Sequence, residues 1–207
     1  MIDEQPFDVL VLGIGNVLWA DEGFGVRAVE ALHEQYEFPK QVRLMDGGTQ
    51  GLYLVQYVQA ARRLLVFDAV DYGLAPGTIR LVRDDEVPRF MGAKKMSLHQ
   101  TGFQEVLASA ALTGRYPREL LLIGVQPQQL EDYGGSLTDV VKQGMPECLR
   151  LALQQLEDWG VQPLPRTRPL AADEHLNAHA LGLDAYEAGR PGAEAACRIG
   201  DARVLYG

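Results

Sequence analysis

The sequence contains only two cysteines, Cys148 and Cys197, and they lie far apart in the chain. Neither belongs to a CxxC pair, so their spacing predicts no disulfide framework and no thiolate zinc site. No run of apolar residues approaches the roughly 18 that a transmembrane helix requires, and the acidic start MIDEQPFD lacks the basic region of a secretory signal. These absences predict a soluble, cytoplasmic protein with two reduced structural thiols.

Basic residues are also in short supply. Lys and Arg number 19 against 28 Asp and Glu, which gives a formal net charge of −9. Nucleic acids and anionic membranes are polyanions that such a surface repels, so we expect neither as a partner. Metal ions and cationic partners suit the surface better. With 207 residues, 47% of them hydrophobic, the chain can bury one sizeable core.

Motifs for covalent catalysis are missing as well. The sequence has no GxSxG elbow, no GxxxxGK[ST] loop and no Cys/His signature of a thiol protease. His175 and His179 are four residues apart, but the intervening LNA lacks the glutamate of an HExxH motif, so we interpret both as surface residues. No side chain is therefore identified as a covalent nucleophile.

Short apolar runs alternate with longer segments of helical period, which is typical of a parallel sheet with crossover helices. The apolar runs predict strands that are buried on both faces. The expected strands are 7–13, 42–46, 64–68, 78–82 and 120–125, and the expected helices are 22–35, 52–61, 100–112 and 137–159. The last helix should bend near Pro146.

The composition changes after this last helix. Residues 162–169, QPLPRTRP, are proline-rich and polar, which predicts an extended segment. We therefore expect one compact domain over residues 1–161 and a proline-rich linker with a C-terminal tail over 162–207. The tail is expected to pack on the domain or stay mobile, with a helix in ADEHLNAHALGLDAYEAG and a short extended end in CRIGDARVLYG.

The most informative segment is GIGNVLWADEGFG, residues 13–25, between a predicted strand and a predicted helix. It begins like a dinucleotide-binding loop, but the third glycine of GxGxxG is replaced by Leu18. Asp21 and Glu22 also stand where a pyrophosphate would bind the positive end of the helix. The two acids can instead cap that helix. Capping does not explain the glycines around them, which would let a backbone or a metal ion approach closely.

Three acids follow the predicted strands, and ligands of open α/β sheets bind at the carboxyl ends of strands. Glu22 follows the first strand, Asp46 ends the second, and Asp68 ends the third, where its carboxylate should emerge at the rim of the sheet. His99 lies at the start of a predicted helix. Two carboxylates and an imidazole suit nickel, zinc or cadmium and leave coordination positions open. Asp46 can be a fourth ligand, an orienting residue or a general base.

Five segments in this order, GIGNVLWADEGFG, DGGTQG, FDAVDYG, SLHQTGF and GVQP, resemble the nickel–iron hydrogenase maturation endopeptidases over about residues 8–159. The resemblance implies an α/β fold, a three-layer α/β/α sandwich around a mostly parallel, about five-stranded sheet. It implies an enzyme, usually a monomer, that removes a C-terminal peptide from the precursor of the hydrogenase large subunit after nickel insertion. It also implies that Glu22, Asp68 and His99 contact nickel carried by the substrate, and that Asp46 is the aspartate of the DGGT loop.

Two other functions stay open at this stage. A dinucleotide-dependent oxidoreductase would bind NAD tightly, and a nickel-binding maturation chaperone would use the same ligands without changing the mass of the precursor.

Overall fold

The computed structural model describes residues 7–91 and 98–191, except for the side chains of residues 89–101 and 179. Its centre is a five-stranded sheet with the strand order β3-β1-β4-β6-β5. The strands are β1 (Val9–Ile14), β3 (Val42–Gly48), β4 (Arg63–Ala69), β5 (Ile79–Arg83) and β6 (Glu119–Val125). All pairs are parallel except the antiparallel pair of β5 with β6. The expected mostly parallel, five-stranded sheet is confirmed.

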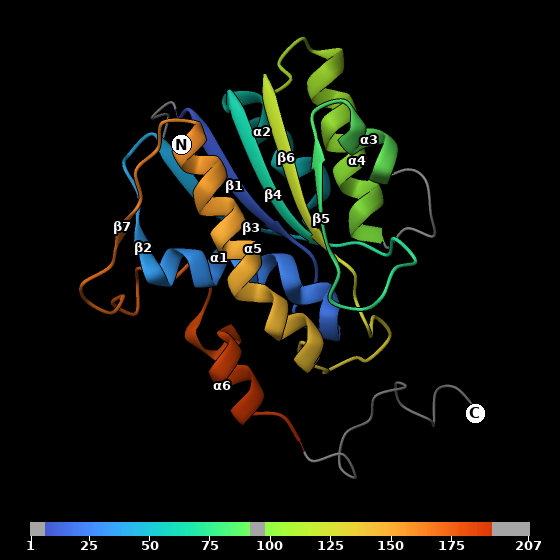
Figure 1. Cartoon of the computed structure of the whole chain (residues 1–207), viewed down its shortest axis with the longest axis vertical. Helices are drawn as coiled ribbons and strands as arrows, with labels where there is room; N and C mark the ends of the chain where they lie inside the picture. The colour runs from blue at the N-terminus through green and yellow to red at the C-terminus, as the bar shows by residue number, and fades with distance from the viewer. Residues whose placement is uncertain (1–6, 92–97, 192–207) are drawn as a thin grey trace.

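Helices cover both faces of this sheet (Figure 1). Helices α1 (Phe24–Gln35) and α5 (Asp139–Asp158) pack on one face, and α2 (Val55–Ala60), α3 (Glu86–Met91) and α4 (Leu98–Leu112) pack on the other. Short 3₁₀ turns, η1 (Ala20–Gly23) and η2 (Gly51–Leu54), precede α1 and α2. The expected three-layer sandwich is therefore confirmed. No helix within the described ranges is long and apolar enough to cross a membrane.

Side chains of each strand alternate between the two helical layers, as the pleat requires. In β1, Val9 and Val11 pack with α1 and α5, whereas Leu10 and Leu12 pack with the helices of the other face. Both sets are fully buried, which explains why the central runs are apolar throughout. The expectation that the strands are buried on both faces is wrong for β5, where Leu81 is 39% exposed. This strand lies at the edge of the five-stranded sheet and pairs there with β6 alone.

Local signals placed the main helices to within a few residues but missed three short elements. The expected helix 22–35 begins as η1, and α5 contains Pro146 inside its span as expected. The short helix α3 was not expected. Nor were the strands β2 (Tyr36–Glu37) and β7 (Leu164–Pro165), because two-residue strands exist only through their pairing partner. In α5, Cys148 is a buried free thiol whose pKa burial raises to about 12, so it is chemically inert.

Residues 162–191, which we call the C-terminal arm, pack along the outside of α1 and α5 (Figure 1). The arm begins with β7, which pairs antiparallel with β2, and the Arg166 guanidinium donates to the carbonyl oxygens of His33 and Tyr36 at 3.2 Å. The turn η3 (His179–Leu181) and helix α6 (Leu183–Ala188) follow. Glu187 of α6 accepts hydrogen bonds from Ser136 and Lys142, both at 2.5 Å. The expected extended end CRIGDARVLYG lies outside the described residues.

Candidate active site

The glycines of the 13–25 segment allow three backbones to meet at the carboxyl edge of the sheet. A Cβ atom on Gly25 would lie 2.2 Å from the carbonyl oxygens of both Ile14 and Phe67. Gly15 has a φ of 131°, and its Cβ would lie 1.8 Å from the carbonyl oxygen of Glu22. These contacts press η1 and the start of α1 against the ends of β1 and β4. The glycines thus bring the backbone of Glu22 to the edge of the sheet where β4, which contains Asp68, ends.

This close packing predicts a large effect for a single methyl group. Gly25→Ala is expected to destabilise the fold by about 3 kcal/mol or more, because its Cβ would overlap two backbone oxygens that cannot move independently. Gly144→Ala is the matched control, because its Cβ would meet only ordinary contacts at 3.7 Å and beyond inside α5, and alanine should add up to about 1 kcal/mol there. Thermal unfolding of both variants checks this, and equal melting temperatures would contradict it.

Asp21 is a fully buried carboxylate that ties η1 to the loop before α5. Its Oδ2 atom accepts from the amides of Gln128 and Gln129 at 2.8 and 2.9 Å, and its Oδ1 atom accepts from the amide of Thr138 at 2.7 Å. The Thr138 hydroxyl donates to the same carboxylate at 3.0 Å. Neither η1 nor α1 has a side-chain cap, so the capping hypothesis is wrong for this residue. Asp21 instead accepts from the amide of Thr138, the residue directly before α5.

Glu22 and Asp68 occupy neighbouring segments of the same edge. Glu22 is half-buried in η1, while Asp68 has no exposed surface. Asp68 lies within β4 and not in a turn, so its carboxylate is enclosed by the protein instead of emerging at the rim. Alternation along β4 directs it to the layer of α2 and α4, where Leu64 and Val66 pack.

The start of α4 belongs to this edge as well. A Cβ on Gly102 in its second turn would lie 3.3 Å from the Cα atom of Gly51, which follows β3. His99 stands in the first turn of α4, but its side chain is outside the described residues. Among the described side chains, no group of three or more His, Cys, Asp or Glu is arranged to hold a metal ion. The hypothesis that Glu22, Asp68 and His99 contact one ion therefore stays a prediction.

Asp46 lies near the end of β3, with its side chain on the other face of the sheet. It is in register with Gly13, which is also in register with Phe67, so Asp46 shares the face of Phe67 that α1 covers. Burial raises the pKa of Asp46, and the polar groups of Asn177 and Gly48 and the charge of Arg27 act in the opposite direction. Its Oδ1 atom is buried without a hydrogen-bond partner among the described residues. A carboxyl group that keeps its proton to higher pH is suited to proton transfer.

Gln126, in the GVQP segment, organises the loop that follows β4. Its Oε1 atom accepts from the amides of Tyr72 and Leu74 at 2.7 and 3.1 Å, and its Nε2 atom donates to Asp71 at 3.0 Å. The side chain is 5% exposed. GVQP and FDAVDYG are therefore one structural unit at the site. Sequence reasoning paired them only through the resemblance, because a buried glutamine has no local signature.

The fold and the site define an α/β/α protein whose acidic residues gather at the carboxyl edge of a mostly parallel sheet. The family model HycI, described as hydrogenase maturation protease, matches residues 26–155. The chain therefore belongs to the hydrogenase maturation proteases, a family of peptide hydrolases, as its motifs predicted. Membership of this family gives no support to the dinucleotide-dependent oxidoreductase considered from the sequence.

Individual relatives agree with this assignment. The chain is 59% identical over 197 residues to the hydrogenase expression/formation protein HoxM of Cupriavidus necator, covering 95% of this chain and 98% of the relative. It is 42% identical over 159 residues to the hydrogenase 2 maturation protease of Escherichia coli, covering 76% and 96%. The solved structure of the E. coli endopeptidase HybD superposes with a TM-score of 0.74 at 40% identity, over 78% of this chain and 99% of that one.

These coverages differ in an informative way. The E. coli relative is matched almost in full, yet about a quarter of this chain has no counterpart in it. The HoxM relative matches 95% of this chain, which leaves too few residues unmatched to omit the arm. The family model ends at residue 155, before the arm begins. The arm thus lies outside the part of the chain that the family model matches, whereas the match to HoxM is long enough to include it.

Proposed function

We propose that this protein removes a C-terminal extension from the nickel-loaded precursor of a nickel–iron hydrogenase large subunit. Family membership supports the cleavage of a peptide bond during hydrogenase maturation. The observation that supports the proposal is that η1, with Glu22, packs against the end of β4, with the buried Asp68, while the second turn of α4 lies against Gly51 after β3. Such oxygen and nitrogen donors suit a borderline cation such as nickel, and zinc or cadmium can bind the same donors.

In this proposal nickel arrives with the substrate. Glu22, Asp68 and His99 contact the ion and thereby hold the precursor in the orientation that cleavage needs. A precursor without nickel offers these three side chains nothing to bind, so it is not positioned. Cleavage is thus coupled to completed metal insertion.

Asp46 is the proposed general base. It takes a proton from a water molecule as the water oxygen attacks the scissile carbonyl carbon, and it returns a proton to the amine as the carbon–nitrogen bond breaks. A raised pKa suits both steps, because the group must accept and release the proton near the working pH. No covalent intermediate with the protein is required.

We further propose that the protein acts on its precursor as a cytoplasmic monomer.

Exposed apolar side chains near the site support a protein substrate. Leu52 and Tyr53 on η2 are 57% and 78% exposed, and Tyr133, which packs edge-on against Trp19 at 5.3 Å, is 47% exposed. Side chains of this kind are typical of surfaces that contact another protein.

Mass spectrometry of the precursor tests the proposal. The wild-type protein should shorten nickel-loaded precursor by one C-terminal peptide and leave nickel-free precursor unchanged. Glu22→Gln, Asp68→Asn and His99→Ala should each slow this cleavage at least about tenfold. Glu147→Gln, on the exposed side of α5, is the control and should cleave normally.

Two results would contradict the proposal in different ways. If the wild-type protein bound nickel-loaded precursor without changing its mass, the protein would be a chaperone and not a peptidase for that precursor. If all three variants cleaved at nearly the wild-type rate, the ligand assignment would be wrong although the activity stood.

A further inference from the structure

The loop between β6 and α5, residues 126–138, is hydrogen-bonded along the segment that contains η1. Three of its amides donate to the Asp21 carboxylate. In return, the amide of Asp21 donates to the carbonyl oxygen of Gln129 at 3.0 Å. An antiparallel bridge also pairs Trp19, directly before η1, with Tyr133 of the loop. The β6–α5 loop thus binds η1 through both side chain and backbone.

Two residues of the types that usually cap helices are used for this contact instead. Thr138 is the N-cap residue of α5, yet its hydroxyl makes no capping hydrogen bond to this helix, all of which lies within the described ranges. The hydroxyl donates to the Asp21 carboxylate at 3.0 Å. An N-cap bond stabilises a helix, so a local preference would direct the Thr138 side chain to α5. In this protein the side chain fastens η1.

The backbone directly before Asp21 is strained. Ala20 is buried and has a φ of 39°, in the left-handed region that alanine rarely adopts. Such a backbone persists where the surrounding contacts fix it, and the contacts of Asp21 with the β6–α5 loop do so here. Glu22 follows at once, and its amide donates to the carbonyl oxygen of Trp19 at 2.9 Å. The position of Glu22 therefore depends on how its neighbours are held.

We propose that Asp21, bound by the β6–α5 loop, is a positioning residue that sets the place of Glu22 relative to β4 and Asp68. The inference rests on the proposed roles of Glu22 and Asp68 as ligands of the substrate's nickel. Pairing with β1 and β6 fixes β4, whereas Glu22 lies in a 3₁₀ turn outside the sheet. The start of the β6–α5 loop is tied to the segment after β4, because Gln126 binds two of its amides. One loop thus fastens η1 to the neighbourhood of Asp68.

Cleavage kinetics of the full-length protein test the proposal. Thr138→Val removes the hydroxyl that binds Asp21 but keeps the amide, and it should lower kcat/KM for nickel-loaded precursor about tenfold. Thr138→Ser keeps the hydroxyl and should cleave at the wild-type rate. In a Glu22→Gln background, Thr138→Val should cost less than about twofold more, because Asp21 acts through Glu22. A tenfold loss in both backgrounds would overturn the inference, as would a wild-type kcat/KM for Thr138→Val alone.

Leu156→Ala is the control for a general loss of stability. Leu156 is fully buried in α5, near the opposite edge of the sheet, where the carbonyl oxygen of Trp159 accepts from Arg63 at the start of β4. The substitution should lower the melting temperature more than Thr138→Val does. At a temperature where both variants are folded, Leu156→Ala should keep the wild-type kcat/KM.

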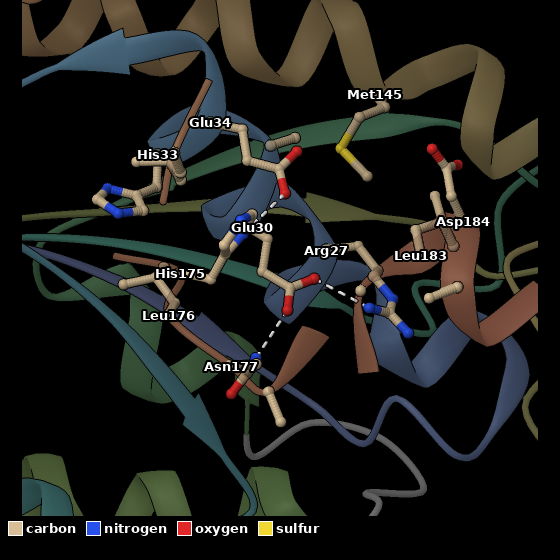
Figure 2. A pocket seen from close by; sticks show the side chains of 15 residues that line it. Arg27, Glu30, His33, Glu34, Met145, His175, Leu176, Asn177, Leu183 and Asp184 are labelled. Atoms are coloured by element: carbon tan, nitrogen blue, oxygen red, sulfur yellow. Dashed lines mark hydrogen bonds and ion pairs between the residues drawn. The ribbon is translucent and has the colours of Figure 1, made fainter. Parts of the chain in front are cut away.

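The C-terminal arm supplies a second control, because it holds α1, the helix that follows η1. Figure 2 shows the arm across a cavity of about 490 Å³ from the polar face of α1. There Glu30 accepts from Asn177 at 2.7 Å, and Glu34 lies 3.7 Å from His175. Glu34→Gln weakens the contact between the arm and α1 without touching the β6–α5 loop. It should leave kcat/KM unchanged.

Hydrogen exchange gives a readout that needs no activity. The amide of Glu22 should exchange at least about tenfold faster in Thr138→Val, and the increase should exceed that of the β4 amides, because the loosening is local. An increase shared equally by β4, or none at all, would overturn the inference. If the wild-type protein cleaved no precursor, the proposed function would fail, whereas hydrogen exchange would still decide whether the β6–α5 loop holds η1.

Discussion

Replacing Asp46 with asparagine is expected to slow precursor cleavage by about 10²–10⁴-fold, the usual effect of losing a general base, and to make the folded protein more stable. Cleavage slows because asparagine cannot accept a proton. The gain in stability follows from burial, which raises the pKa of Asp46 because the charged form is poorly solvated in the native state. An asparagine of the same shape carries no charge and avoids that cost. Residues that lower stability in return for function are common in active sites.

The pH dependence follows from the same raised pKa. Between the ordinary aspartate pKa, about 4, and the higher pKa of the folded state, the native protein binds more protons than the unfolded chain. Asp46 therefore makes stability fall as pH rises through this window, and the loss is complete above it. The stability gain of Asp46→Asn should be largest at neutral pH and vanish below about pH 4.

Thermal unfolding at several pH values, beside cleavage assays, checks both halves of this prediction. Asp184→Asn is a suitable control, because Asp184 is an exposed residue in the first turn of α6. A variant that cleaved at the wild-type rate would remove Asp46 from the mechanism. If Asp46→Asn were less stable than the wild type at neutral pH, the hydrogen bonds of the Asp46 carboxylate would contribute more to stability than its burial costs.

Asp21→Asn is expected to have the largest effect on stability, a loss of roughly 3–5 kcal/mol. The carboxylate of Asp21 is fully buried and accepts from three backbone amides and one hydroxyl. An amide side chain replaces one acceptor oxygen by a donor, which would point its hydrogens at other donors. Hydrogen bonds to charged groups are worth about 1.5–3 kcal/mol each, and the unsatisfied amides add their own cost.

Asp139→Asn provides the comparison for this prediction. Asp139 is exposed in the first turn of α5, next to Thr138, so its loss should cost less than about 1 kcal/mol through the helix dipole alone. A loss of about 3 kcal/mol in Asp21→Asn corresponds to a fall in melting temperature of roughly 10 °C for a protein of this size. Equal melting temperatures for the two variants would mean that Asp21 does not fasten η1 to the loop before α5.

The contrast between Asp21 and Glu22 illustrates where sequence reasoning reached its limit. The two acids are adjacent, and a local pattern treats them alike. Asp21 is buried because the loop before α5, more than a hundred residues later, turns its amides toward it. Glu22 remains half-buried at the edge of the sheet. Only the packing of distant segments distinguishes a structural acid from a candidate ligand.

The amino-acid sequence by itself determined the central strands, the main helices and the family, because apolar periodicity and glycine spacing are local properties of the chain. The tertiary structure decided which face of the sheet Asp46 occupies. It also decided that Asp68 is enclosed and that β5 lies at an exposed edge. Burial and hydrogen bonding between remote segments are set by how the layers pack, and no short stretch of sequence encodes that packing.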